Sequence, residues 1–156
     1  MLANRVRVLF EPPDALLGPR GAGWQVAMSA LTNERGYIGA SGNSMARRLE
    51  AMIDHADDLD PVARQELADL WIRGSALQAM GGRQGLVASV LSSLGKLGTT
   101  ELLFDVAEHR VRSEGALGML REPATDGLIS APGGRIAGGT SQIQRNIIGE
   151  RILGLP

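Results

Sequence analysis

The sequence predicts an all-α fold, an antiparallel four-helix bundle over residues 21–156 that follows a short extended arm over residues 1–20. Apolar residues recur at helical spacing from Gly23 onward, and clusters of proline, aspartate or glycine separate the periodic segments. The early connections between these segments are short, which favours antiparallel neighbours. With 156 residues, 44% of them hydrophobic, the chain is long enough for one domain with its own core.

The arm differs from the rest of the chain. Val6, Val8 and Phe10 alternate with their neighbours in the pattern of one short strand, and the Glu-Pro-Pro-Asp segment at residues 11–14 ends that pattern. A single strand cannot pair with itself. The arm is therefore expected either to pack on the helices or to be the end of a β-domain that this sequence lacks.

The first helix is predicted from Gly23 to about His55. Its apolar stripe contains Trp24, Ala27, Met28, Leu31, Ile38, Met45, Leu49, Met52 and Ile53. Large side chains on such a stripe usually belong to the core. We therefore expect Trp24 to be buried.

The second helix is predicted to begin at Pro61 and to run to about Met80. Asp60 has the side chain of an N-cap, and proline is well suited to the first helical position because its φ angle is already fixed. Trp71 lies on the apolar stripe of this helix. It is expected in the core for the same reason as Trp24.

The third helix is predicted over residues 86–112, with an inward stripe of Val87, Val90, Leu91, Leu94, Leu97, Leu102, Leu103 and Val106. Gly95 and Gly98 either weaken this helix or mark a close contact with a neighbour. Residues 114–134 are weakly patterned and contain two prolines, so they are expected to form a linker.

The linker leads to the most informative stretch, in which a glycine pair precedes the fourth helix. Gly138 and Gly139 allow positive φ angles and close approach of another group. Ser141 and Gln144 have the spacing of a capping box, so a helix is expected to start here with free N–H groups that suit an electron-rich ligand. An ordinary junction between a loop and a helix has the same features.

Composition excludes several classes of function. The net charge of −1 and the lack of a basic patch argue against nucleic acid as a partner. The chain has no cysteine, and its histidines, His55 and His109, are expected to interact with a helix dipole or with solvent, so no metal site is predicted. No apolar run reaches the ~18 residues of a membrane span and no signal peptide is visible, which predicts a cytoplasmic protein without a membrane partner.

Two segments resemble a known family. Ile136-Ala-Gly-Gly-Thr-Ser-Gln-Ile-Gln-Arg-Asn-Ile-Ile-Gly-Glu-Arg151, continuing to Pro156, closely resembles the C-terminal signature of the flavin-dependent acyl-CoA dehydrogenases. Gly21-Ala-Gly-Trp-Gln-Val-Ala-Met28, with Leu31-Thr-Asn-Glu-Arg35, resembles the passage from that family's β-domain into its C-terminal helical domain. The resemblance implies only this last domain, and residues 1–20 would then be the end of the missing β-domain.

The resemblance implies an activity and a cofactor. Family members oxidise an acyl-CoA thioester to the 2,3-enoyl thioester, and FAD takes the hydride. Many of them carry the glutamate that removes the α-proton just before the Gly-Thr of the terminal motif, where this chain has Gly138. A branch of the family places that glutamate on the first helix before an arginine, and Glu34 matches that position as the catalytic base.

Cofactor contacts are implied in the same way. Thr140 and Gln142 match positions that contact FAD in the family. Two segments that reach the FAD of a neighbouring subunit are replaced: Arg-x-x-Phe-Gly by residues 60–65, and Gln-x-x-Gly-Gly-x-Gly by residues 113–119. The implied partners are an acyl-CoA substrate and further dehydrogenase-like subunits, in a homo-oligomer or a hetero-oligomer.

Three functions are compatible with the sequence. The first is an acyl-CoA dehydrogenase domain that acts only when joined to the missing domains. The second is a non-catalytic bundle that assembles with itself or with a related dehydrogenase subunit, which the glycine at position 138 favours. The third is a small-anion binder that uses the helix start after Gly139.

Overall fold

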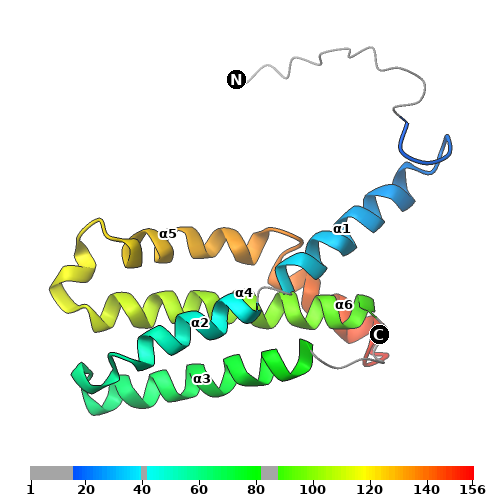
Figure 1. The fold of residues 1–156 in the computed structure, drawn as a ribbon. Coiled ribbons are helices and arrows are strands. Elements are labelled where there is room, and N and C mark those ends of the chain that lie inside the picture. Colours follow the sequence, from blue (N-terminus) through cyan, green and yellow to red (C-terminus); the bar gives the residue numbers. More distant parts are fainter. Residues whose placement is uncertain (1–15, 40–41, 82–87) are drawn as a thin grey trace.

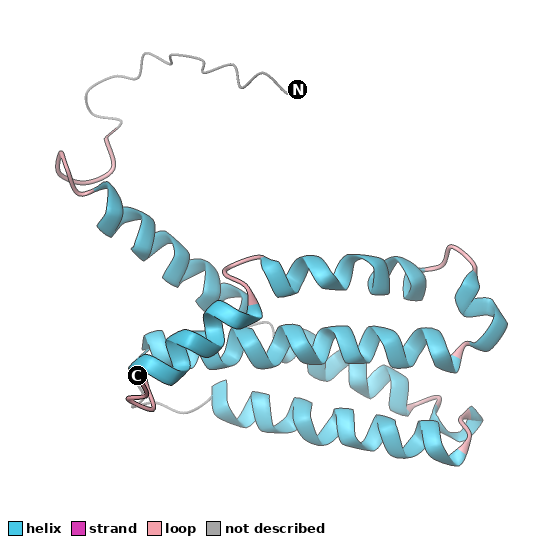
Figure 2. Ribbon diagram, turned by 180° about the vertical axis from the view of Figure 1, so that it is seen from behind, coloured by secondary structure: helices cyan, strands magenta, loops and turns pink. Residues whose placement is uncertain are grey.

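The computed structural model describes residues 16–39, 42–81 and 88–156. These residues form six α-helices: α1 (Gly23–Gly39), α2 (Gly42–Ile53), α3 (Pro61–Gly81), α4 (Ala88–Ser113), α5 (Pro123–Ile136) and α6 (Ser141–Arg151). Two 3-10 helices, η2 (Ala56–Asp58) and η3 (Gly115–Met119), lie between them. The described part of the chain contains no strand, which confirms the all-α fold (Figure 2). The strand expected within residues 1–20 lies outside the described residues.

Helix α4 is the central element. All five other α-helices contact it, and Figure 1 shows α3 and α5 running along opposite sides of it. The N-terminal half of α1 projects away from the bundle, while its other end packs against α4. The sequence predicted a single helix from Gly23 to about His55, whereas the structure has two helices, α1 and α2, in that segment.

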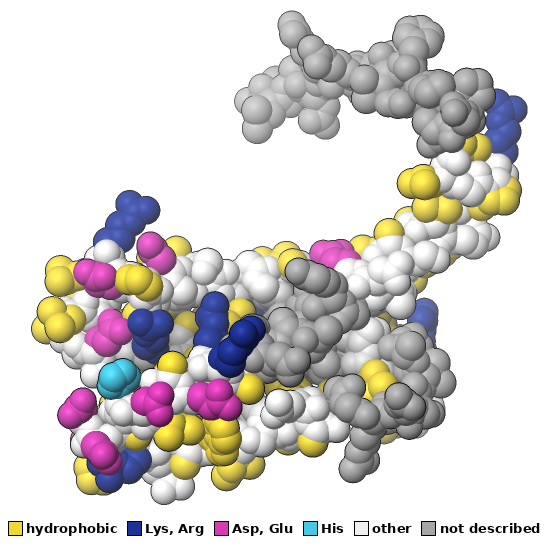
Figure 3. All heavy atoms as spheres, viewed as in Figure 1, with side chains coloured by type: hydrophobic (Ala, Val, Ile, Leu, Met, Phe, Trp, Pro, Cys, Tyr) yellow, Lys and Arg dark blue, Asp and Glu magenta, His cyan; other side chains and the backbone are white. Residues whose placement is uncertain are grey.

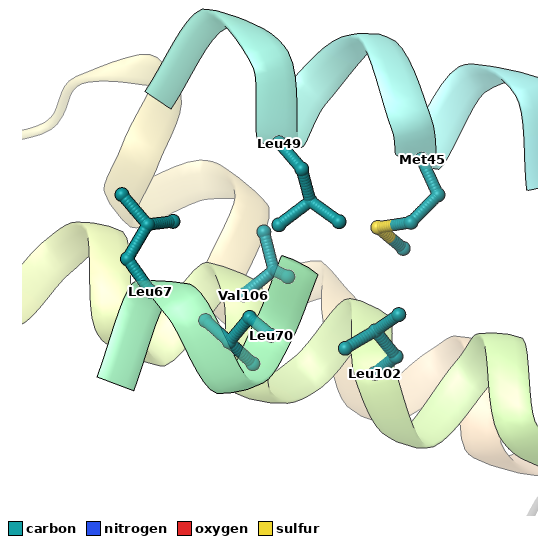
Figure 4. Close-up of a cluster of buried hydrophobic side chains, with 6 residues drawn as sticks. All are labelled: Met45, Leu49, Leu67, Leu70, Leu102 and Val106. Atoms are coloured by element: carbon teal, nitrogen blue, oxygen red, sulfur yellow. The ribbon is translucent and has the colours of Figure 1, made fainter. Parts of the chain in front are cut away.

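The core lies between α2, α3 and α4. It consists of Met45, Leu49, Leu67, Leu70, Leu102 and Val106 (Figure 4), with Met52 and Trp71 packed against it. The side chains of Leu49 and Leu102 are fully buried. The predicted apolar stripes contain four of these residues, Met45, Leu49, Leu102 and Val106, so helical periodicity correctly located this part of the core.

Local signals at the start of α3 also have the predicted effect. A side-chain oxygen of Asp60 accepts hydrogen bonds from the amides of Val62 (2.8 Å) and Ala63 (3.0 Å), and Pro61 is the first helical residue. These bonds satisfy N–H groups that no carbonyl within the helix can reach. They also hold the pKa of the Asp60 carboxyl below its usual value, with the Ala63 bond as the largest cause.

Two glycines mark close packing around α4. A Cβ on Gly98 would collide with the side chain of Leu77 on α3, so this glycine does mark a helix contact. A Cβ on Gly118 would collide with the backbone carbonyl of Val111, which the returning turn η3 covers. A side chain can rotate away from such a collision, whereas a backbone carbonyl cannot.

Trp24 contradicts the sequence prediction, because 75% of it is exposed. Leu31, on the same stripe, is also exposed. The physical reason is the projection of α1: no other described helix lies beneath its first turns (Figure 1). Periodicity reports that one face of a helix is apolar, but it does not report which part of the protein covers that face.

The predicted linker was also wrong, since it contains α5. Pro123 occupies the first helical position, which favours a helix start. The buried residues of α5 are Ala124 and Ala131. Ile129, a large apolar residue of the same helix, is exposed. Small residues facing α4 gave no stripe of large apolar side chains, and Pro132 inside the helix concealed it further.

Candidate functional site

The turn before α6 has the backbone that its glycines predicted. Gly138 and Gly139 have φ angles of 66° and 98°, in the region that glycine adopts without strain. Thr140 and Ser141 both have side chains typical of an N-cap, and the structure uses the first of them. Thr140 is the N-cap, and its hydroxyl oxygen accepts from the amide of Ile143 at 3.3 Å. The capping box expected from Ser141 and Gln144 does not form, because both side chains bind elsewhere.

Gln144 braces the turn from inside. Its Nε2 donates to the carbonyl of Gly138 at 3.0 Å, and a Cβ on Gly139 would lie only 2.7 Å from the same nitrogen. The side chain is fully buried, and no hydrogen-bond partner is found for its Oε1 among the described residues. The turn therefore requires glycine at position 139 and leaves a polar atom for another group to satisfy.

Lys96 reaches the same turn from α4. Its Nζ donates to the carbonyl of Gly139 at 2.7 Å and to the carbonyl of Arg135 at 3.2 Å. The residue is fully buried. Burial lowers the pKa of Lys96, and the carboxylates of Glu101 and Glu34 oppose that effect.

Glu101, also on α4, holds the start of α6. The Ser141 hydroxyl donates to Glu101 Oε1 at 2.6 Å, and Arg135 lies 2.7 Å from Oε2. The Ser141 hydrogen bond is the largest cause that lowers the pKa of Glu101, and Arg135 and Arg145 act in the same direction. The guanidinium of Arg135 also lies over the ring of Phe104, 3.9 Å from its centroid, in a cation–π contact.

The sequence-predicted site residues gather around this end of α4. Thr140 is half-buried at the start of α6, and Gln142, the second residue of that helix, is exposed. Glu34 is exposed on α1, and its charge acts on Lys96. The glycine pair and the N–H groups in the first turn of α6 suit an electron-rich group at this edge.

The two replaced segments meet at the opposite end of α4. Arg64 donates to the carbonyls of Ala56 (3.2 Å), Asp57 (3.3 Å) and Leu59 (3.5 Å), so its guanidinium is already engaged. A cavity of about 370 Å³ nearby is lined by the carboxylates of Asp58, Asp60 and Glu66 and by one arginine, Arg112, which pairs with Glu66 at 3.1 Å. Carboxylates repel phosphate oxygens, so the three acidic side chains make this cavity a poor site for a phosphate group.

A second cavity, of about 510 Å³, also lies at that end, between α2, α4 and the start of α5. Figure 3 shows basic and acidic side chains side by side over this part of the surface. His109 lines the cavity but is almost fully buried, with Nδ1 3.3 Å from a carboxylate oxygen of Glu66. The predicted solvated position is therefore wrong for His109, whereas His55 is exposed as expected.

Sequence reasoning missed Lys96 and Glu101. A signal for Lys96 was present, since it is the single lysine among sixteen basic residues and lies within an apolar helical segment. Nothing in the sequence distinguished Glu101 from the exposed carboxylates. No group of three or more metal-ligating side chains occurs in the part of the chain that the structure describes, and no helix there is long and apolar enough to span a membrane.

Comparisons with known proteins give a consistent picture. Residues 21–153 match the family model described as acyl-CoA dehydrogenase, C-terminal domain. Among curated relatives, acyl-CoA dehydrogenase IpdE1 of Mycobacterium tuberculosis is 32% identical over 92% of this chain and 41% of its own length. Acyl-CoA dehydrogenase FadE34 of the same organism is 28% identical over 95% of this chain and 22% of its own length.

A solved structure has the same fold. A variant of the Tcur3481-Tcur3483 steroid ACAD superposes with a TM-score of 0.73 at 23% identity, over 89% of this chain and 42% of that one. The chain thus spans about two fifths of IpdE1 and of this structure. On the match over residues 21–153, the chain belongs to the acyl-CoA dehydrogenase family and corresponds to its C-terminal domain.

Proposed function

We propose that this chain forms one wall of an FAD-dependent acyl-CoA dehydrogenase site, completed by further domains or subunits. The observation that carries the proposal is the turn at Gly138–Thr140, which is fastened to α4 beside the helix that bears Glu34. Thr140 and Gln142 would hold the flavin at the start of α6. The cofactor supplies a hydride acceptor for the oxidation of an acyl-CoA thioester to the 2,3-enoyl thioester.

In this proposal Glu34 is the base that removes the α-proton of the thioester. Gly138 has no side chain, so it cannot serve at the place where many family members have their base. A carboxylate acts best as a base when an apolar environment raises its pKa toward neutrality. Trp24 and Leu31 expose apolar surface on the same helix, and a covering domain would exclude water from both that surface and Glu34.

The test of the base is Glu34→Gln in the assembled enzyme, with Glu50→Gln on the exposed face of α2 as the matched control. Loss of a general base lowers turnover by about 10²–10⁴-fold. We expect such a loss for Glu34→Gln with flavin content unchanged, and no loss for the control. Full turnover of the Glu34 variant would remove Glu34 from the reaction.

The chain on its own is proposed to be inactive. A single wall buries too little of a flavin or a thioester to bind either as a complete pocket does. We expect the purified 156-residue chain to be colourless and to gain flavin only with complementary dehydrogenase-like domains, in a homo-oligomer or hetero-oligomer in the cytoplasm. A stoichiometric flavin absorbance band from the chain alone would refute this expectation.

A second candidate is a non-catalytic subunit that assembles with a dehydrogenase-like partner. The engaged Arg64 favours it, since its guanidinium already donates to three carbonyl groups, and the arginine that lines the adjacent cavity, Arg112, pairs with Glu66. Co-purification with a flavin-containing partner whose turnover is insensitive to Glu34→Gln would support this second function. A strictly monomeric chain at micromolar concentration, even with candidate partners present, would count against both functions.

A further inference from the structure

Lys96 is the one lysine in the chain and is fully buried. Burying an ammonium is unfavourable unless hydrogen bonds replace its water, and a well-packed apolar residue is often as stable at such a position. The stability of the bundle therefore does not by itself account for a lysine here. Its contacts indicate what else it does.

The two acceptors of Lys96 lie on either side of Gly138. One is the carbonyl of Arg135, in the last turn of α5, and the other is the carbonyl of Gly139, directly before the N-cap Thr140. The ammonium thus joins the end of α5 to the beginning of α6 across a turn with two positive φ angles. Without this tether, the glycine pair would permit many other backbone conformations.

A second tether lies five residues further along the same helix. Glu101 accepts from the hydroxyl of Ser141 at 2.6 Å. Thr140 therefore has one neighbour, Gly139, bound to Lys96 and the other, Ser141, bound to Glu101. Both anchors belong to α4, the helix that all the others contact.

We propose that Lys96 is a positioning residue, whose ammonium fixes the turn at Gly138–Thr140 so that the start of α6 meets the flavin in one orientation. The part that concerns flavin rests on the proposed function; the part that concerns the turn does not. Lys96 touches no reacting atom. It acts through the backbone carbonyls and through Thr140.

The first test follows backbone amide exchange in Lys96→Met, which keeps an unbranched side chain of similar length and removes the charge. Arg110→Met, on the exposed far part of α4, is the control. We expect amide exchange over residues 137–143 to become at least about tenfold faster in Lys96→Met, with less than a twofold change in the peptides of α2 and α3. The control should change neither region.

The ammonium can then be restored chemically. Because the chain has no cysteine, Lys96→Cys can be alkylated selectively in denaturant with an aminoethyl group, or with a propyl group of similar size, and refolded. The aminoethyl form should recover slow exchange in the turn, and the propyl form should not. Equal recovery by both forms would assign the effect to volume rather than to charge and would overturn the proposal.

Two further outcomes of the exchange test would overturn it. Unchanged exchange over residues 137–143 in Lys96→Met would show that the turn holds itself. An equal increase throughout the bundle would show that Lys96 contributes only to global stability. If Lys96→Met does not fold, the test uses the unmodified chain, in which the rate of acylation of its single lysine side chain can be measured. A rate as high as that of a lysine amide in free solution would contradict a buried, hydrogen-bonded ammonium.

The flavin part is tested in the assembled flavoenzyme. Lys96→Met should lower flavin retention by at least about tenfold at temperatures well below unfolding, and the aminoethyl form should restore it. Faster exchange in the turn with unchanged flavin retention would uphold the tether and reject the flavin contact in the proposed function. The two parts can therefore fail separately.

Discussion

Substitution of Glu101 by glutamine is expected to destabilise the chain much more than most exposed carboxylate changes do. The substitution keeps the size of the side chain and removes its charge. In the structure the carboxylate accepts from Ser141 at 2.6 Å and pairs with Arg135 at 2.7 Å, and the Glu101 and Arg135 side chains are 26% and 31% exposed. Hydrogen bonds to charged groups contribute about 1.5–3 kcal/mol each, and partial exposure places this cluster toward the lower end.

We therefore expect Glu101→Gln to lower the free energy of unfolding by about 1–3 kcal/mol at pH 7. Glu114→Gln is the matched control, since Glu114 pairs with Arg110 on the surface at 3.4 Å and such pairs contribute about 0–1 kcal/mol. Urea unfolding followed by circular dichroism measures both. Equal losses for the two variants would refute the argument that Glu101 anchors the start of α6.

The pH dependence gives an independent check. Because the pKa of Glu101 is lowered in the folded state, its contribution is present above the carboxyl pKa of the unfolded chain, near 4.5, and is lost as the pH falls through the folded value. The difference in stability between the unmodified chain and Glu101→Gln should thus be largest near neutral pH and shrink on acidification. A difference that stays constant from pH 7 to pH 3 would contradict the assignment.

Three further predictions concern the scaffold. Leu102→Ala removes a fully buried side chain from the core and should lower the free energy of unfolding by about 2–5 kcal/mol in urea titrations. Gly118→Ala should destabilise the chain because its Cβ meets the carbonyl of Val111, whereas Gly127→Ala, in open space on α5, should leave the melting temperature equal or higher. Asp60→Ala should lower the melting temperature more than Asp60→Asn, because asparagine keeps a capping oxygen. The stabilising effect of the Asp60 carboxylate should weaken as the pH falls through the lowered pKa of that group, whereas the effect of asparagine should not.

Local signals predicted well wherever the outcome depended on neighbours in sequence. Asp60 and Pro61 began a helix, and the glycine pair at positions 138 and 139 adopted positive φ angles, because caps and turns are decided by a few adjacent residues. Apolar periodicity likewise located Leu49 and Leu102 in the core. The fold class required no further information.

The failures arose where the outcome depended on the packing of elements that are far apart in sequence. Trp24 is apolar and periodic, yet the part of α1 that carries it extends beyond the bundle. Helix α5 was missed because alanines rather than large residues face α4. Ser141 had the spacing of a capping box, but Glu101, forty residues earlier, binds its hydroxyl instead.

The polar residues of α4 show how the site and the scaffold depend on each other. Lys96 and Glu101 hold the turn and α6, Asp105 pairs with Arg73 of α3 at 2.7 Å, and His109 meets Glu66 of α3. Glu101, Asp105 and His109 follow one another at intervals of four and form one polar stripe along α4, whereas Lys96, five residues before Glu101, lies on a different face. The start of α6 and the turn before it are held to α4 by hydrogen bonds, which have defined directions. The geometry of the candidate site therefore depends on α4 as well as on the C-terminal motif itself.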